Sequence, residues 1–391
     1  MSTQAARSIL FTHTSPQQGF KLLELPPELA DSLTSNDPPT LQLKSLSTDA
    51  SQRATTNPEA REYVNLCTPT KTYRVRQVHS SNSIHVIRPS DGGAERGDIN
   101  IVGGETDELN LVESMTSIAK CGSTLELHTP AEGFSAVPIL EKMLGVYDEV
   151  DDDKDMVEAI EPVEENGVIQ RVFVDVPVSQ AQCETGWIEL CAFVLGRGTG
   201  DAVALCRRPS AKVKLDVWKR VLEGAVLQAI ELEKQFLVPD LWKSVLDDGE
   251  EPFPRPLFEA VVRRVCEMGG GQLFAEGGLK WASIDKESCM RWVGETYLEA
   301  MAPTSASAIG RSEFLNAWKD LLPETWRNEV AFSKLTENSY NHPDPTTICF
   351  VNGVDRQKIK KNVSTDASAA TAAKKTRNWH ELFKNQKRQK R

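Results

Sequence analysis

The chain lacks the short motifs that identify most nucleotide-dependent, serine-dependent and zinc-dependent enzymes. The dipeptide Gly-Lys never occurs, which excludes a phosphate-binding loop that ends in Gly-Lys-Ser or Gly-Lys-Thr. There is no Gly-x-Ser-x-Gly elbow and no His-Glu-x-x-His pair, and the six histidines are dispersed. Because no residue is singled out as a nucleophile, base or metal ligand, we expect neither catalysis nor a cofactor.

Features of secreted and membrane proteins are also missing. None of the eight cysteines belongs to a Cys-x-x-Cys pair, so the sequence predicts buried, reduced thiols in place of a zinc site or disulfides. The N-terminus carries no apolar secretory segment, and no apolar run approaches the ~20 residues of a membrane helix. We therefore expect an intracellular protein without membrane contact.

Charge is unevenly distributed. Residues 354–391 hold twelve Lys and Arg against three Asp and Glu, a net charge of +9, and since the whole chain carries −11 the remainder carries −20. Residues 148–165 hold ten acidic residues and one lysine. A basic tail on an acidic body is typical of an arm that meets nucleic acid or an acidic protein face, although such tails also serve solubility or nuclear import.

Residues 1–135 are predicted to form a β-rich domain. Polar and apolar residues alternate within 71–87, which indicates two strands separated by a turn at 80–83. Many short strands between turn clusters are typical of a barrel or sandwich, and a domain this small leaves sheet edges open to a partner strand. The residues expected to contact such a partner are Tyr73, Val75, Gln77 and Val86.

Three helix–helix–hairpin modules follow, which predicts winged-helix domains at 136–210, 211–285 and 286–352. The elements expected in the first are a helix at 137–147, a solvated acidic insert at 148–166, a strand at 168–176, a helix at 180–191 and a hairpin with a glycine-rich turn at 196–200. The clearest helix is 211–236, where apolar residues recur at three- and four-residue steps. No helix follows the glycines at 196–200, so they do not form a dinucleotide-binding loop.

Residues 353–391 are expected to be a disordered basic tail, because they are rich in Ser, Thr, Ala and basic residues. Trp379, Leu382 and Phe383 interrupt the tail at helical spacing. This apolar group favours a partner-binding motif, and docking back onto the chain's own body is the alternative. The predicted fold class is thus multidomain α+β: a β-barrel-like heterodimerisation domain, three winged helices and the tail.

Several segments resemble, in order along the chain, fungal members of the "defective in sister chromatid cohesion" (Dcc) family. They are residues 20–29, 71–87, 186–193 with 206–210, and 377–384. The resemblance implies a nuclear, non-catalytic subunit of the alternative, replication factor C-like clamp loader. It further implies that the β domain joins the small and large subunits of that loader. The winged helices would reach DNA and the catalytic subunit of DNA polymerase epsilon, and the sliding clamp PCNA would be engaged indirectly at replication forks.

Any DNA contact is expected to be weak and independent of sequence, because phosphate neutralisation dominates such affinity. The candidate phosphate contacts are Arg197, Arg207, Arg208, Lys212, Lys214, Arg263, Arg264 and Lys280. The alternative function is a site-specific winged-helix regulator of transcription or chromatin. It would need a strongly basic recognition helix, and none stands out in the sequence. An enzyme of an unrecognised type is the third interpretation.

Overall fold

The computed structural model describes residues 10–13, 16–45, 64–89, 114–148, 165–195, 205–246, 249–266, 279–353 and 355–356. It is a mixed α+β protein that divides into two compact units. The first unit comprises Met1–Phe134 with Pro177–Gln180, and the second comprises Ser135–Val176 with Ala181–Arg391. The predicted glycine-rich turn, the tail beyond residue 356 and most of the predicted acidic insert lie outside the described residues.

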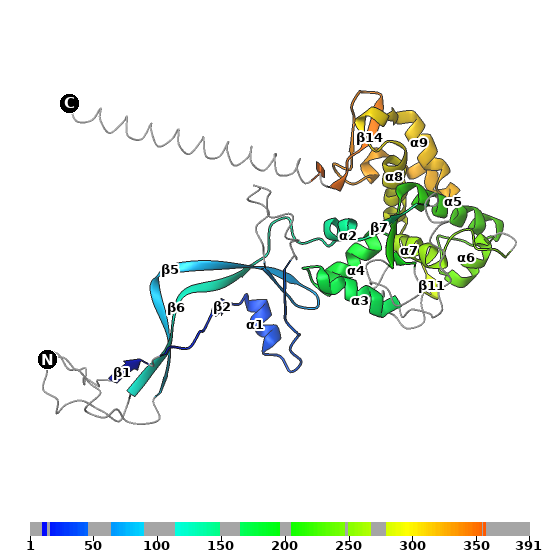
Figure 1. The fold of residues 1–391 in the computed structure, drawn as a ribbon. Coiled ribbons are helices and arrows are strands. Elements are labelled where there is room, and N and C mark those ends of the chain that lie inside the picture. The colour runs from blue at the N-terminus through cyan, green and yellow to red at the C-terminus, as the bar shows by residue number, and fades with distance from the viewer. Residues whose placement is uncertain are drawn as a thin grey trace, which may run out of the picture. The chain divides into compact units, whose positions relative to one another are not determined.

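The first unit is built on a six-stranded sheet in the order β1-β6-β5-β4-β3, with β2 also paired to β6. Its strands are β1 (Leu10–His13), β2 (Leu22–Glu24), β3 (Gln42–Ser45), β4 (Val64–Cys67), β5 (Thr72–Pro89) and β6 (Ser114–His128). β5 and β6 form one long antiparallel ribbon, and β1 lies at the end where β6 begins (Figure 1). The described strands do not close into a barrel by themselves, so completion of a barrel by partner strands stays a prediction.

β5 continues without interruption through residues 80–83, where we predicted a turn. That prediction is wrong. His79 pairs with Ser123 and Ile84 with Cys121, so residues 80–83 lie opposite Gly122 alone. A bulge of this kind bends a strand and increases its twist without ending it. Small polar residues suit a bulge as well as a turn, and pairing with β6 decides between the two.

One helix of the first unit, α1 (Pro27–Leu33), is absent from the sequence prediction. Pro27 occupies its first turn, where a missing N–H costs no hydrogen bond. Leu29 is buried together with Leu66 of β4 and Tyr73 of β5, and Val75 packs against this cluster. Seven residues are too few to show a helical period, so packing on the sheet selects this helix.

The second unit contains three modules of similar order: helix, strand, helix, helix and then two strands, of which the second module has one strand and an isolated bridge. The first module contains α2 (Val137–Met143), β7 (Gly145–Tyr147), α3 (Glu165–Asp175), α4 (Gln180–Glu189), β8 (Phe193–Val194) and β9 (Cys206–Pro209). The second contains α5 (Ala211–Leu227), β10 (Phe236–Leu237), α6 (Val238–Val245), α7 (Arg255–Val265) and β11 (Trp281–Ala282). The third contains α8 (Lys286–Met301), η7 (Ser305–Ser307), β12 (Ile309–Gly310), α9 (Arg311–Asp320), η8 (Glu324–Glu329), η9 (Phe332–Lys334), β13 (Tyr340–Asn341) and β14 (Thr347–Phe350).

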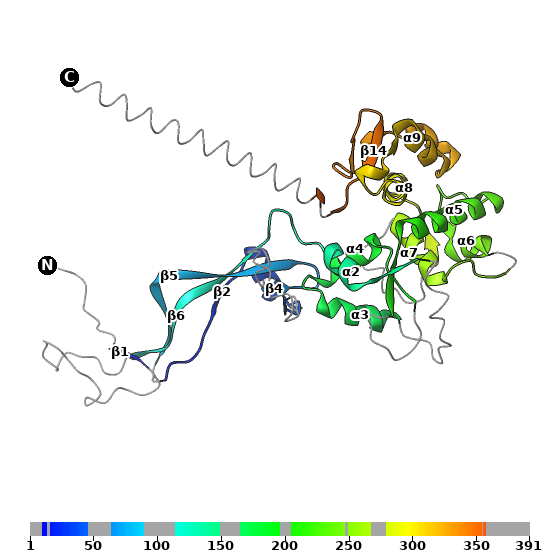
Figure 2. The ribbon, with the colours of Figure 1, turned by 45° about the horizontal axis from the view of Figure 1, so that its top comes forward.

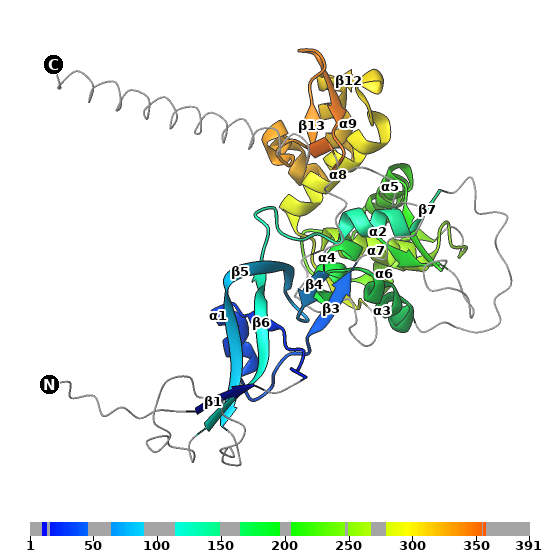
Figure 3. The same ribbon diagram turned by 60° about the vertical axis from the view of Figure 1, so that its left-hand side comes forward.

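The same strand order recurs in these modules, with the last strand between the first and the second. The sheets are β7-β9-β8 in the first module and β12-β14-β13 in the third. In the second module β11 pairs with β10. An isolated β-bridge between Cys266 and Ile284 occupies the position that the third strand has in the other two modules. β7 pairs in parallel with β9, whereas β10 and β12 pair antiparallel with their partners. In Figure 3, β12 and β13 lie beside α8 and α9.

The predicted strand at 168–176 is wrong, because these residues belong mainly to α3. Val168, Ile169, Val172 and Phe173 are buried, a spacing of one and then three residues that matches one face of a helix. Val174, on the opposite face, is exposed. The β-branched residues favoured a strand, but their periodicity is helical, and burial follows the periodicity.

The connection from α3 to α4 belongs to the first unit, because strand side chains bind its backbone. Asn65 Nδ2 donates a hydrogen bond to the carbonyl of Pro177 at 2.7 Å. Thr72 Oγ1 accepts one from the N–H of Ser179, also at 2.7 Å. These buried polar contacts satisfy backbone groups that would otherwise cost stability.

The second and third modules share one hydrophobic core, to which the first module adds Tyr147, Cys191 and Phe193. Trp218 of α5 is fully buried and donates from its indole N–H to the carbonyl of Leu321 at 2.8 Å. Its ring meets that of Trp292 of α8 edge-on, with 6.1 Å between centroids. Trp318 of α9 donates in the same way to the carbonyl of Met290 at 2.9 Å. Each buried indole contributes a large apolar area, and its N–H hydrogen bond fixes the orientation of the ring. These contacts hold the helices together as one body.

Replacing Gly224 with Ala should destabilise the second unit. α5 and α6 lie side by side (Figure 2), and a Cβ at Gly224 would be 2.6 Å from Ser244 Oγ and 2.7 Å from the Ser244 carbonyl oxygen. Such overpacking costs about 1–3 kcal/mol, which should exceed the about 1 kcal/mol that Ala gains over Gly in a helix. Thermal unfolding should therefore show a lower midpoint. The exposed Glu223→Ala is the control, and a raised midpoint for Gly224→Ala would contradict the close approach.

The eight cysteines are all buried, as the sequence predicts, and each is a free thiol in the structure. Burial raises the pKa of the Cys191 thiol and, well above its usual range, the pKa of the Cys289 thiol. A raised pKa leaves less of the reactive thiolate at pH 8. Native protein should therefore react slowly with Ellman's reagent, and denatured protein should expose eight thiols at ordinary rates. A fast native phase would show that a thiol is accessible.

Candidate functional site

The ribbon of the first unit has an open outer edge. β4 pairs with β5 only along residues 72–75. Beyond that, no described strand adjoins this side of β5 at 76–79 or 84–89, although β6 pairs with the other side. Backbone donors and acceptors on such an edge are a template for an added strand. The candidate functional site is therefore a strand-binding edge, a chemistry that requires no catalytic residue.

Apolar side chains accompany this edge. Ile84 and Ile87 of β5 are 45% and 49% exposed, and Phe11 of β1, which pairs with β6 on its side away from β5, is 48% exposed. Phe11 also stacks edge-on with His13 and His85, with centroids 5.1 and 6.4 Å away. Exposed isoleucines on an open strand favour aggregation unless another chain covers them. Ile84, Ile87 and Phe11 are not among the predicted partner contacts, although their apolar character within predicted strands was the available signal.

The residues predicted to contact a partner have different surroundings. Tyr73 is 7% exposed and lies under α1, and Val75 is half-buried beside it. Gln77 is exposed and donates from Nε2 to Ser123 Oγ at 2.8 Å, whereas Val86 is half-buried. Tyr73 and Val75 thus serve the chain's own core, and Gln77 and Val86 remain near the open edge. The tail residues Trp379, Leu382 and Phe383 lie outside the described part of the chain.

The basic candidates of the first module gather where β9 meets α5. Arg208 Nε donates to the carbonyl of Glu141 at 3.3 Å, and Arg207 Nη1 donates to that of Cys206 at 3.2 Å. Lys212, in the first turn of α5, is exposed. Lys214 is only 8% exposed, and its Nζ lies 3.6 Å from Glu299 Oε2 of α8. It is therefore poorly placed for a phosphate. Arg197 falls outside the described residues.

The basic candidates of the second module are less available. Arg263 and Arg264 end α7, and both are half-buried with no hydrogen-bond partner for Nε. Burial lowers the pKa of Arg263, while the nearby carboxylates of Glu259 and Glu165 oppose that shift. Burial, then the Glu259 charge, raises the pKa of Glu165. Acidic neighbours therefore offset the cationic end of α7, and only Lys280 of this set is exposed.

Within the described ranges, no three His, Cys, Asp or Glu side chains gather as a potential metal site. The helices described there include none with the length and apolar character needed to cross a membrane.

Comparison with known proteins agrees with the resemblance seen in the sequence. A family model described as "Sister chromatid cohesion protein Dcc1" matches residues 20–356, which is most of the chain. The resembling segments at 20–29, 71–87, 186–193 and 206–210 fall within this match, and 377–384 falls beyond it. No curated protein matches the sequence.

Proposed function

Because this chain belongs to the Dcc1 family of sister chromatid cohesion proteins, we propose that it is the adaptor subunit of the alternative, replication factor C-like clamp loader. Family membership itself implies a role in sister chromatid cohesion. In the proposed role, the chain directs the loading or unloading of PCNA at replication forks in the nucleus. The observation that carries this proposal is the open outer edge of β5 with its exposed isoleucines.

The partners proposed for this edge are the small and large subunits of the loader. Strands added along 76–79 and 84–89 would complete the hydrogen bonding of β5 and cover Ile84 and Ile87. Buried isoleucines and a completed ladder make such a joint sheet an obligate interface, since neither side is stable alone. ATP hydrolysis then belongs to other loader subunits, in agreement with the missing phosphate-binding loop.

The three modules of the second unit are proposed to be winged helices. Their similar order of helices and strands supports this assignment, as does the position of the last strand between the other two in the first and third modules. In this role they contact the catalytic subunit of DNA polymerase epsilon and, weakly, DNA. For DNA, the junction at Arg208 and Lys212 is the better candidate, because Lys212 is exposed and no carboxylate faces Arg208 in a described ion pair, whereas the cations of α7 lie beside Glu259 and Glu165. The same feature of α7 disfavours a site-specific regulator of transcription.

Replacing Ile84 and Ile87 together with Asp should abolish recovery of the loader subunits. An added strand would have to bury these carboxylates, and buried unpaired charge is costly. The measurement is affinity purification of the tagged chain from cells, followed by mass spectrometry. Val174→Asp, at an exposed position of α3, is the matched control and should retain the loader subunits. Undiminished recovery with the double variant would refute the strand-addition proposal.

Replacing Arg208 and Lys212 with Ala should weaken DNA binding equally for unrelated duplex sequences. Each lost phosphate contact should reduce the slope of log affinity against log salt by about 0.9, so the pair should reduce it by nearly 2. Fluorescence anisotropy at several salt concentrations measures both effects. Lys219→Ala, which removes an exposed lysine already paired with Asp216, is the control. An effect confined to one DNA sequence would favour the site-specific regulator.

A further inference from the structure

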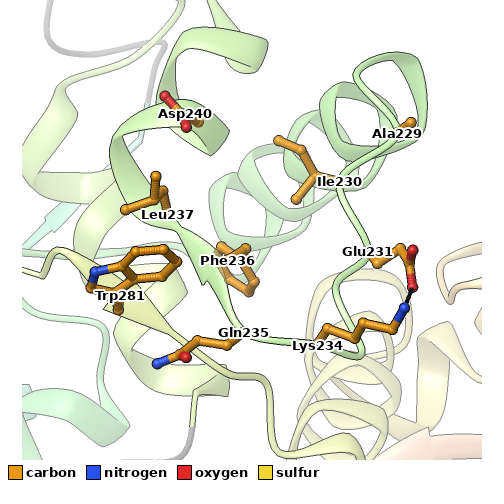
Figure 4. Close-up of a pocket in the computed structure, with 9 residues that line it drawn as sticks. All are labelled: Ala229, Ile230, Glu231, Lys234, Gln235, Phe236, Leu237, Asp240 and Trp281. Carbon is orange, nitrogen blue, oxygen red and sulfur yellow. Dashed lines mark ion pairs between the residues drawn. The ribbon is translucent and has the colours of Figure 1, made fainter.

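A hollow of about 330 Å³, lined by both apolar and polar side chains, lies at the end of α5, against β10 and β11. Figure 4 shows Leu237 and Trp281 side by side on one wall, with Ile230 opposite them. Trp281 is 56% exposed although it is the largest apolar side chain there. Because a cavity of about 150 Å³ accepts benzene, this hollow has room for an aromatic side chain. An exposed tryptophan beside an open hollow marks a binding surface.

The chain around the hollow is acidic. Residues 229–240 supply every lining residue except Trp281, and they hold three acids, Glu231, Glu233 and Asp240, against Lys234, a net charge of −2. Lys234 Nζ lies 2.6 Å from Glu231 Oε2, so the only cation of this segment is already paired. An occupant with apolar side chains and basic flanks is therefore complementary to this surface.

One segment of the same chain has this chemistry. Residues 374–391 hold eight Lys and Arg against one Glu, a net charge of +7, around Trp379, Leu382 and Phe383. On a helix these three side chains would share one face, because they are spaced by three and four residues. We propose that residues 374–391 bind the hollow beside Trp281. The apolar face lies against Trp281 and Leu237, and the basic flanks lie over the acidic segment.

The tether is long enough for this docking. Arg356 and Trp379 are 23 residues apart in sequence, which allows up to about 75–80 Å when extended and roughly 24–29 Å as a random coil. A compact unit of this size is roughly 40–45 Å across. Such a tether gives the tail an effective concentration on the order of millimolar, so a Kd of about 100 µM keeps the hollow mostly occupied. The docking therefore requires only modest complementarity.

The experiment uses the full-length protein with the subunits that copurify with it. Trp379 is replaced by the photoreactive residue p-benzoylphenylalanine, and the cross-links formed on irradiation are mapped by mass spectrometry. The expected cross-links fall within residues 229–240 or on Trp281. Cross-links only to another subunit, only elsewhere on this chain, or no cross-link at all would overturn the proposal.

A second variant separates docking from chance proximity. Trp281→Ala should reduce the cross-link yield by about tenfold or more, as expected when an apolar anchor is truncated. Met301→Ala, at another exposed apolar position, is the matched control and should leave the yield unchanged. Independently, trypsin should cleave after Arg377 and Lys384 faster in Trp281→Ala than in the unmodified chain. Equal cleavage rates would overturn the proposal, and an unchanged circular dichroism melt would show that the variant is folded.

Discussion

A β-strand that is paired on one side only leaves backbone N–H and C=O groups unpaired on the other, and β5 meets β4 along only four of its eighteen residues. The first unit cannot compensate through a large core, since α1 covers only the part of the sheet near Leu66 and Tyr73. Beyond residue 75 no described strand adjoins the outer edge of β5, and Ile84 and Ile87 of this strand are exposed. Among the described strands, the sheet of the first unit is therefore incomplete along β5. Such an edge can bind a strand of another chain and so join the two chains.

The second unit is organised by the opposite principle. Its second and third modules bury tryptophans from α5, α8 and α9 in one core, and two of the indole N–H groups donate to backbone carbonyls of the same core. A self-sufficient body of this kind can present exposed surfaces without depending on a partner for its fold. The β9–α5 junction and the hollow beside Trp281 are such surfaces. The chain thus separates assembly, in the first unit, from recognition, in the second.

Charge supports this division. The cations that the sequence offers for DNA are not equivalent in the structure: Lys214 is buried against Glu299, and Arg263 lies near Glu165 and Glu259. Exposed cations remain at Lys212 and Lys280, which is sparse for an affinity dominated by phosphate neutralisation. Protein contacts are therefore the main interactions to expect of this adaptor, with DNA as a secondary one.

The sequence by itself determined the mixed α+β class, the buried thiols, the order of a β region before three helix-rich modules, and the family, because composition, period and motif order are local properties. Tertiary structure decided the rest. Residues 80–83 form a bulge because β6 pairs on either side of them. α1 exists because Leu29 meets Leu66 and Tyr73, and this contact turns predicted partner residues into core. Whether a lysine binds phosphate or a carboxylate, and whether a tryptophan is buried or borders a hollow, depends on residues distant in sequence. Local sequence patterns do not specify which distant residues will become neighbours.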